Sequence, residues 1–380
     1  MSLQELRAEI DRTDDELVKL FSRRMEIVSK IAEEKASGGA AVAHPDRERE
    51  IILRTTGNVP GDLSASTRVL MNTLFDLSRA YQRQLMQKGE AELTGKIRAA
   101  LSQTAKVLPQ TARVACQGAA GAYSQLACDK MFSQADIMYF KGFEGVFRAV
   151  EKGLCQYGVL PVENSTYGAV GEVYDLLRSS NVHIIRGTRI QISHALLAKP
   201  GAKLSDIREL LSHEQALGQC SNFLARHPEI KVTICENTAA AARIVAESGR
   251  GDLASISSPE CAGLYELSVI DSNVRNENGN YTRFICISRD MEIYPGADKM
   301  SVMLTTEHRP GALYSVVARL AALGVNLSKL ESRPIPGRHF EFMFSLVLDA
   351  SVYSEGLLEL LGDLSESTEM FRYLGAYSEV

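Results

Sequence analysis

The sequence has few features of secreted, membrane-bound or nucleic-acid-binding proteins. It contains no run of about 18 apolar residues and its N-terminal stretch is charged, so we expect neither a membrane span nor a signal peptide. Its seven cysteines are scattered and none forms a CxxC pair, which indicates reduced thiols in a cytoplasmic protein. A net charge of -5 and the lack of a long basic run argue against nucleic acid as a partner.

Cofactor motifs are also missing. Neither GxGxxG nor the P-loop pattern occurs, and no cluster of residues has metal-ligand spacing, so we expect no cofactor and no metal. The 380 residues, 45% of them hydrophobic and 23% charged, have the composition of a globular protein. This length exceeds one typical core and predicts two or three domains.

Residues 1–88 have the pattern of an all-α domain. Apolar residues recur every seven positions at Leu3, Ile10, Leu17 and Ile31. We expect a first helix to about Lys35, a second from Pro45 and a third over 64–87. Residues 89–112 are predicted to form a polar, Ala-rich helical linker.

Two regions with different secondary-structure patterns follow the linker. Residues 113–290 alternate short strands, glycine-containing turns and helices, which predicts an α/β domain. Residues 299–376 have the order strand, helix, strand, strand, helix, strand, which predicts an α+β ferredoxin-like domain. The predicted fold is therefore multidomain.

One position of the heptad repeat carries a charge. Arg24 continues the apolar series, and a buried guanidinium needs an anionic partner. Lys35 lies about 20° from Arg24 around an ideal helix and about 16 Å along it, so both cations can reach one small ligand. Arg7 is about 25 Å from Arg24, a gap that an antiparallel helix of a second subunit would close. We interpret this face as a site for a dianion; the alternative is a dimerisation helix with surface charges.

The stretch from "LRAEID" to "IAEEK", followed by "DRERE", resembles the all-helical chorismate mutase family. That resemblance implies that chorismate is bound by Arg7 of a second subunit, Arg24, Lys35, Arg47, Glu48, Ser78 and Gln82. Of these, Lys35 and Gln82 act on the ether oxygen, where charge grows as the C–O bond breaks. An ungapped count would instead place Ala80 and Gln84 where we assign Ser78 and Gln82.

Polar clusters in the α/β region lie where strands end or begin. "PVENSTYG" has four consecutive hydrogen-bonding side chains, of which helix capping would explain one or two. "SHEQALGQC" precedes a helix, and its His213 alone carries little weight. "NYTRF" places a hydroxyl beside a guanidinium at the start of a buried strand.

Together these three peptides closely resemble the prephenate dehydratase family over 113–290. The resemblance implies two lobes like those of a type 2 periplasmic binding protein, with the active site in the cleft. It also implies that Thr282 hydrogen-bonds or protonates the departing C4 hydroxyl, with a proton from Glu163 or water. The implied prephenate-binding residues are Glu163, Asn164, Ser165, Thr166, Gln215, Thr282 and Arg283.

The last domain contains "GALYSVV" and "ESRP", which resemble the ACT regulatory domain. The resemblance implies that phenylalanine binds between paired domains at Gly311, Ala312, Leu313, Glu331, Ser332 and Arg333. The alternative is a plain ferredoxin-like packing module.

The sequence thus predicts a bifunctional enzyme that converts chorismate to prephenate and then to phenylpyruvate, is inhibited by phenylalanine, and is at least a dimer. One alternative keeps the dehydratase but makes the helical domain a degenerate dimeriser. Another is a non-catalytic amino-acid sensor, which phenylpyruvate formation would exclude.

Overall fold

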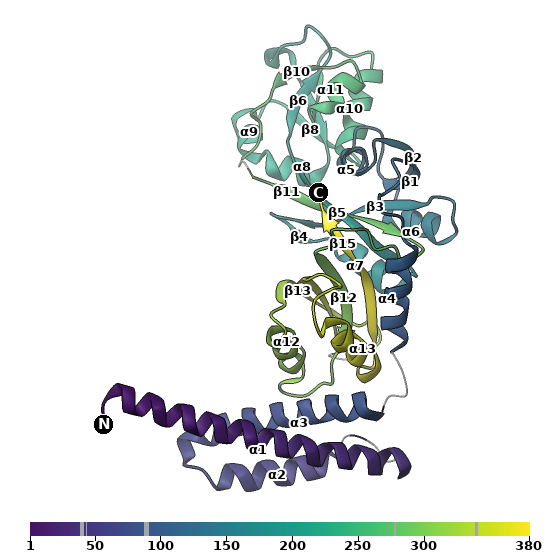
Figure 1. Cartoon of the computed structure of the whole chain (residues 1–380). Helices are drawn as coiled ribbons and strands as arrows, with labels where there is room; N and C mark the ends of the chain where they lie inside the picture. Colours follow the sequence, from purple (N-terminus) through teal and green to yellow (C-terminus); the bar gives the residue numbers. More distant parts are fainter. Residues whose placement is uncertain (39–41, 43, 87–90, 277–278, 339–340) are drawn as a thin grey trace. The chain divides into compact units, whose positions relative to one another are not determined.

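The computed structural model describes residues 1–380 except 39–41, 43, 87–90, 277–278 and 339–340 (Figure 1). The chain divides into two compact units. The first comprises Met1–Lys96, Thr306–Gly324 and Glu355–Phe371, and the second comprises Ile97–Thr305, Val325–Ser354 and Arg372–Val380. Among the described residues, no helix combines the length and apolarity that crossing a membrane requires.

The first unit is helical, as predicted for the N-terminal region. Its elements are α1 (Leu3–Gly38), α2 (Pro45–Gly57), η1 (Gly61–Leu63), α3 (Ser64–Met86), α12 (Ala312–Ala322) and α13 (Leu357–Ser367). Pro45 stands in the first turn of α2, where its missing N–H costs nothing. The three N-terminal helices match the predicted ones within a few residues. In the predicted linker, α4 (Glu92–Gln103) is helical, and residues 89 and 90 lie outside the described part.

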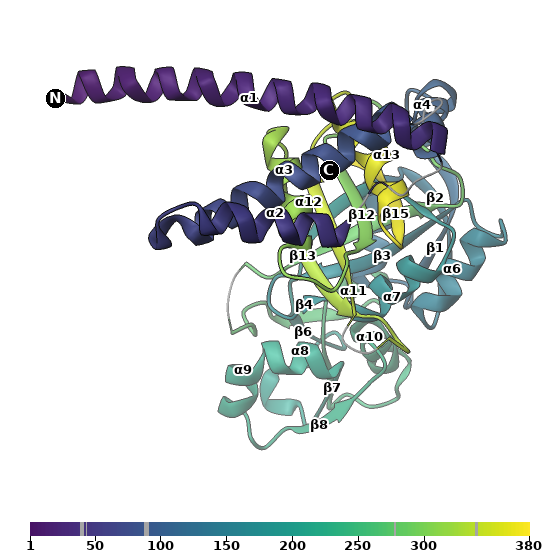
Figure 2. The same cartoon turned by 90° about the horizontal axis from the view of Figure 1, so that it is seen from below.

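The heptad face of α1 is exposed within this unit. The buried residues of α1 are Val28 and Ala32, whereas Leu3, Ile10 and Leu17 are each more than half exposed. Figures 1 and 2 both show the first turns of α1 extending beyond α2 and α3. At these three positions the predicted seam is therefore left largely uncovered by the described part of the same chain.

The second unit contains a ten-stranded sheet with the order β13-β14-β12-β15-β5-β11-β3-β1-β2, and β4 pairs with β3. The strands are β1 (Thr111–Gln117), β2 (Gln134–Phe140), β3 (Tyr157–Asn164), β4 (Gly168–Ala169), β5 (His183–Gln191), β11 (Tyr281–Ser288), β12 (Lys299–Thr305), β13 (Asn326–Pro334), β14 (Phe342–Asp349) and β15 (Phe371–Glu379). The helices α5 (Tyr123–Met131), α6 (Phe143–Glu151) and α7 (Gly171–Ser179) pack on it.

A second, five-stranded sheet forms the other lobe, with the order β10-β6-β9-β7-β8. Its elements are β6 (Ala195–Ala198), η2 (Leu204–Asp206), β7 (Glu209–Ser212), α8 (Glu214–Gln219), α9 (Ser221–Arg226), β8 (Lys231–Ile234), α10 (Thr238–Glu247), β9 (Leu253–Ser257), α11 (Glu260–Leu264) and β10 (Ser268–Asp271). Each lobe has its own apolar core. The chain leaves the first lobe after β5 and returns through β11, so the predicted two-lobed α/β fold is confirmed.

The C-terminal region follows the predicted order β12, α12, β13, β14, α13, β15. Its strands nevertheless continue the sheet of the first lobe, because β15 pairs in parallel with β5 through Ser378–Arg186 and Glu379–Gly187. The two helices group with the helical unit instead. The compact units therefore cut across the predicted domain 299–376.

Candidate active sites

Thr282 lies at the centre of a hydrogen-bonded cluster on one face of the ten-stranded sheet. It is opposite Asn164 in the antiparallel pairing of β11 with β3, and it is 8% exposed. Asn164 Nδ2 donates to Thr282 Oγ1 at 2.9 Å and to Asn280 Oδ1 at 2.8 Å. Thr282 Oγ1 accepts this bond and has no acceptor for its own proton among the described residues, so that proton can point at a ligand.

The cluster continues into the second lobe. Asn280 Nδ2 donates to Gln219 Oε1 at 3.0 Å, and His194 Nε2 lies 2.9 Å from the same oxygen. Burial lowers the pKa of His194 to about 4, against the opposing effect of the Gln219 hydrogen bond, so this imidazole is neutral at pH 7. Ser165 Oγ donates to Asn280 Oδ1 at 3.2 Å and accepts from the backbone N–H of Tyr281 at 2.9 Å.

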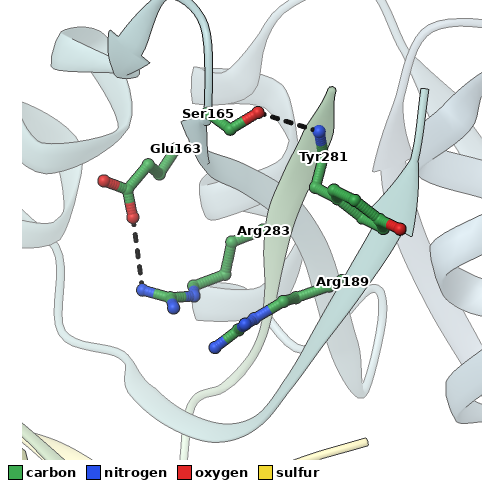
Figure 3. Close-up of a pocket in the computed structure, with 5 residues that line it drawn as sticks. All are labelled: Glu163, Ser165, Arg189, Tyr281 and Arg283. Carbon is green, nitrogen blue, oxygen red and sulfur yellow. Dashed lines mark hydrogen bonds and ion pairs between the residues drawn. The ribbon is translucent and has the colours of Figure 1, made fainter. Parts of the chain in front are cut away.

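Glu163 and Arg283 lie on the opposite face from Thr282, because successive side chains of a strand alternate. Arg283 Nη1 donates to Glu163 Oε2 at 3.2 Å, and Lys329 Nζ lies 2.9 Å from Glu163 Oε1. Glu163 and Arg283 line a cavity of about 330 Å³ together with Ser165, Arg189 and Tyr281 (Figure 3). Both Glu163 oxygens are thus held by cations, and the structure does not bring this carboxylate to Thr282 as the predicted proton donor.

The side chains of two other residues that were predicted to bind prephenate, Thr166 and Gln215, lie outside this cluster. Thr166 donates its backbone N–H to Asn164 Oδ1 at 3.0 Å, while its side chain is exposed. Gln215 is also exposed, and its backbone N–H donates to His213 Nδ1 at 3.3 Å, so its amide is outside the cluster. Gln219, one helical turn later, occupies the cluster in its place.

In the helical unit, Arg24 faces α3 rather than solvent. Its Nη1 donates to Leu74 O at 3.2 Å and also to Ser78 Oγ. Ser78 and Gln82 are 5% and 6% exposed, whereas Gln84 is exposed, so the Ser78/Gln82 register is the one that faces α1. Gln82 Oε1 is buried and has no hydrogen-bond partner among the residues described.

Lys35 and Glu48 lie near each other at the other end of this face. Burial lowers the pKa of Lys35 and the charge of Glu48 opposes that effect; Lys35 Nζ donates to Val42 O at 2.8 Å. Glu48 is ion-paired with Arg79, a residue that the sequence analysis did not assign.

The two other predicted cations are exposed and make no hydrogen bond or ion pair to this face within the described part of the chain. Arg47 pairs with Glu50 at 2.6 Å at the surface, and Arg7 is exposed.

Comparison with known proteins decides the family. Two family models match the chain, chorismate mutase type II over residues 6–83 and prephenate dehydratase over residues 114–292. The bifunctional chorismate mutase/prephenate dehydratase of Escherichia coli (strain K12) is 30% identical over 383 residues, which cover 98% of this chain and 95% of that protein. The chain belongs to this bifunctional family.

Two further relatives match part of the chain. The chloroplastic arogenate dehydratase/prephenate dehydratase 2 of Arabidopsis thaliana is 34% identical over 277 residues, 70% of this chain and 72% of that protein. The solved prephenate dehydratase of Arthrobacter aurescens in complex with L-Phe is 29% identical with a TM-score of 0.64, covering 70% of this chain and 89% of that one. Mutase and dehydratase activities are thus joined in one chain of the bifunctional enzyme.

The residues predicted to bind phenylalanine fall in both compact units of the enzyme. Gly311 precedes α12 with φ of +83°, a left-handed conformation that glycine adopts without strain, and it is followed by Ala312 and Leu313. Glu331, Ser332 and Arg333 lie on β13. There Arg333 Nη2 binds Asp175 Oδ2 of α7 at 2.9 Å.

Sequence reasoning missed Asn280, Gln219 and His194. A signal existed for two of them. Gln219 shares a helix face with Gln215 at four-residue spacing, and Asn280 opens the "NYTRF" peptide. His194 had no such signal, because it stands alone in the sequence between β5 and β6.

Proposed function

We propose that Thr282, Asn164, Asn280, Ser165 and Gln219 form the prephenate site of the bifunctional enzyme. The observation that carries this is the Asn164–Thr282 hydrogen bond, which holds the hydroxyl with its proton unused. That proton points at the C4 hydroxyl of prephenate as it leaves with CO2. Aromatisation drives the reaction, so orientation and assistance to the leaving group suffice, and water supplies the net proton.

Neutral His194 supports Gln219 and does not act as an acid at pH 7, because its pKa is about 4. Glu163 and Arg283 act on the other side of the sheet, where they hold the strands that carry Asn164 and Thr282. Thr166 supports the turn through its backbone.

The chorismate site is proposed to lie between α1 and α3, with Arg24, Lys35 and Gln82 as its central groups. Support comes from the burial of the Gln82 amide beside Ser78, whose hydroxyl accepts from Arg24, and from the cation of Lys35 beside Glu48. A cation and an amide donor at the ether oxygen stabilise charge in the transition state. Ser78 orients Arg24, and Arg47 turns from Glu50 to a substrate carboxylate.

The second subunit is proposed to supply Arg7 and to cover the apolar stripe of α1. The stripe consists of exposed Leu3, Leu6, Ile10, Leu17, Leu20, Ile27 and Ile31. A stripe of this kind on a long helix is typical of a surface that packs on a partner helix. The enzyme is therefore at least a dimer.

We also propose that the C-terminal region is an ACT regulatory domain that binds phenylalanine through the Gly311–Leu313 and Glu331–Arg333 segments. Its element order supports this, as does the related Arthrobacter dehydratase, which was solved in complex with L-Phe. The seven cysteines are free thiols, six of them buried, which fits a cytoplasmic enzyme.

A time course with chorismate tests the whole proposal. Loss of chorismate and formation of phenylpyruvate are followed separately, with and without added phenylalanine. Phenylpyruvate formation that phenylalanine slows supports both sites and the regulation. Chorismate that persists while supplied prephenate is consumed would show that the helical domain only dimerises.

A further inference from the structure

A row of charges crosses the face of the sheet that lies opposite Thr282 (Figure 3). In strand register, Arg283 of β11 is directly opposite Arg189 of β5 on one side and Glu163 of β3 on the other. Like charges directly opposite one another destabilise strand pairing. The Arg189–Arg283 pair therefore needs an anion, and of these two arginines Glu163 hydrogen-bonds only to Arg283.

Glu379 of β15 supplies that anion. It accepts from Arg283 Nε at 2.8 Å, and from Nε and Nη2 of Arg189 at 3.0 and 2.8 Å. Its side chain is 11% exposed. Burial opposes its ionisation, but the two guanidiniums outweigh burial and lower the pKa of Glu379, so it is a carboxylate at neutral pH.

The backbone fixes where this carboxylate stands. Glu379 is paired with Gly187 of β5, and the N–H of Val380 donates to Gly187 O at 2.9 Å. Thr188 Oγ1 donates to Val380 O at 2.7 Å. The backbone that carries the Glu379 carboxylate is thus fixed, so the carboxylate positions the guanidinium of Arg283 and not the reverse.

The position of Arg283 matters because the strand is irregular there. The pairing of β11 with β3 shifts register between Arg283 and Phe284. A bulge next to an active site re-aims the side chains beside it. Thr282 immediately precedes Arg283, so the direction of its hydroxyl depends on where the guanidinium is held.

We propose that Glu379 is a positioning residue for the dehydratase reaction. By joining Arg283 to Arg189 it fixes the bulged strand that presents Thr282 to prephenate. Glu379 does not touch the substrate, since it lies with Arg283 on the opposite face of the sheet. This role rests on the proposed dehydratase site.

The test measures phenylpyruvate formation from supplied prephenate by the full-length protein. Glu379→Gln keeps the size of the side chain and removes its charge. Its kcat is expected to fall about tenfold, equivalent to about 1.4 kcal/mol in the barrier, with KM changed less than about threefold. Glu379→Asp keeps the charge and is expected to recover most of kcat. The double variant Arg189→Gln/Glu379→Gln also removes one of the two opposed cations. Its kcat is expected to be higher than that of Glu379→Gln alone.

Glu209→Gln is the matched control. Glu209 also binds two cations, Arg250 and Lys231, is 16% exposed, and lies in the other lobe. It is expected to lose thermal stability without losing kcat. The rate of chorismate loss in Glu379→Gln serves as a second control and is expected to be unchanged.

An unchanged kcat in Glu379→Gln overturns the proposal. So does a loss that Glu209→Gln or the mutase activity shares equally, because such a loss is general destabilisation. A double variant no better than Glu379→Gln overturns it as well. If the unsubstituted protein forms no phenylpyruvate from prephenate, the dehydratase assignment fails first and is separately identified.

Discussion

Among single side chains, the proposed role of Thr282 depends on the direction of its hydroxyl, which is set by the hydrogen bond that Oγ1 accepts. Asn164 holds Oγ1, so removal of the hydroxyl removes an oriented donor while leaving the strand intact. Thr282→Val is therefore expected to lower kcat for dehydration by about a hundredfold or more, the usual contribution of a positioned proton donor. Mutase activity of the same protein is the control, and a dehydratase rate near that of the unsubstituted protein would refute the role.

Lys35 is proposed to have the corresponding role for the mutase reaction in the helical unit. Burial lowers its pKa, but a lysine with a carboxylate nearby remains a cation at neutral pH. Lys35→Ala is expected to lower the mutase kcat by about 10²–10³-fold, as the loss of a preorganised donor does, and to spare dehydration of supplied prephenate. If either Lys35→Ala or Thr282→Val abolishes both activities in folded protein, the assignment of two separate sites is wrong.

Gln219 and Gln215 offer a comparison within one short peptide. Gln219 bonds with Asn280 and His194, whereas the Gln215 amide is exposed. Gln219→Ala leaves Asn280 Nδ2 without its acceptor and is expected to lower kcat/KM for prephenate by about tenfold. Gln215→Ala is expected to change it less than about twofold. Steady-state kinetics on both variants decide, and the reverse ranking would favour the assignment made from the sequence.

Among secondary-structure elements, α3, α12 and α13 meet at one carboxylate. Asp363 of α13 binds Arg319 of α12 at 2.6 Å and Arg83 of α3. Burial opposes ionisation of Asp363, but the two cations outweigh it and its pKa is lowered. A depressed carboxylate pKa contributes stability above the unfolded value of about 4, and this stability is lost as pH falls through the folded value.

Asp363→Asn is therefore expected to lower the thermal midpoint at pH 7, and this difference is expected to shrink as pH falls below the unfolded pKa of about 4 toward the lower folded value. Thermal unfolding between pH 3 and pH 8 provides the measurement. The exposed Asp46 provides the control, since Asp46→Asn is expected to leave the thermal midpoint unchanged at every pH. A pH-independent difference for Asp363→Asn would show that the pair is not ionic in origin.

In the whole molecule, the mutase site as proposed here requires a second subunit. Arg7 is exposed within one chain and lies on the helix whose apolar stripe is uncovered. If each site combines Lys35 of one subunit with Arg7 of the other, inactive Arg7→Ala and Lys35→Ala proteins complement each other. Equal mixing and re-association are expected to restore about a quarter of the mutase activity, because half of the dimers are mixed and each has one intact site. Activity that stays absent on mixing would show that each site is made by one chain.

Much of this architecture was predictable because local patterns carry it. The heptad repeat predicted α1, Pro45 marked the start of α2, and the pattern of strands and helices predicted the α/β region and the final β–α–β–β–α–β order. The peptides around Asn164 and Thr282 predicted the dehydratase residues that do meet on adjacent strands. Each of these inferences needed only neighbours within a few positions along the chain.

Other features exist only after folding. The order of amino acids dictates which side chains are present at each strand end, but strand pairing decided that Arg283 meets Glu379, 96 positions away, instead of the substrate face. Gln215 and Gln219 share one face of α8, and their positions along the helix decided that Gln219 is the one that reaches Asn280. The entry into the second lobe decided that His194 lies beside them. The physical reason is that side-chain direction depends on strand alternation and helix phase, whereas partners far apart in sequence are fixed only by the register of the assembled sheets.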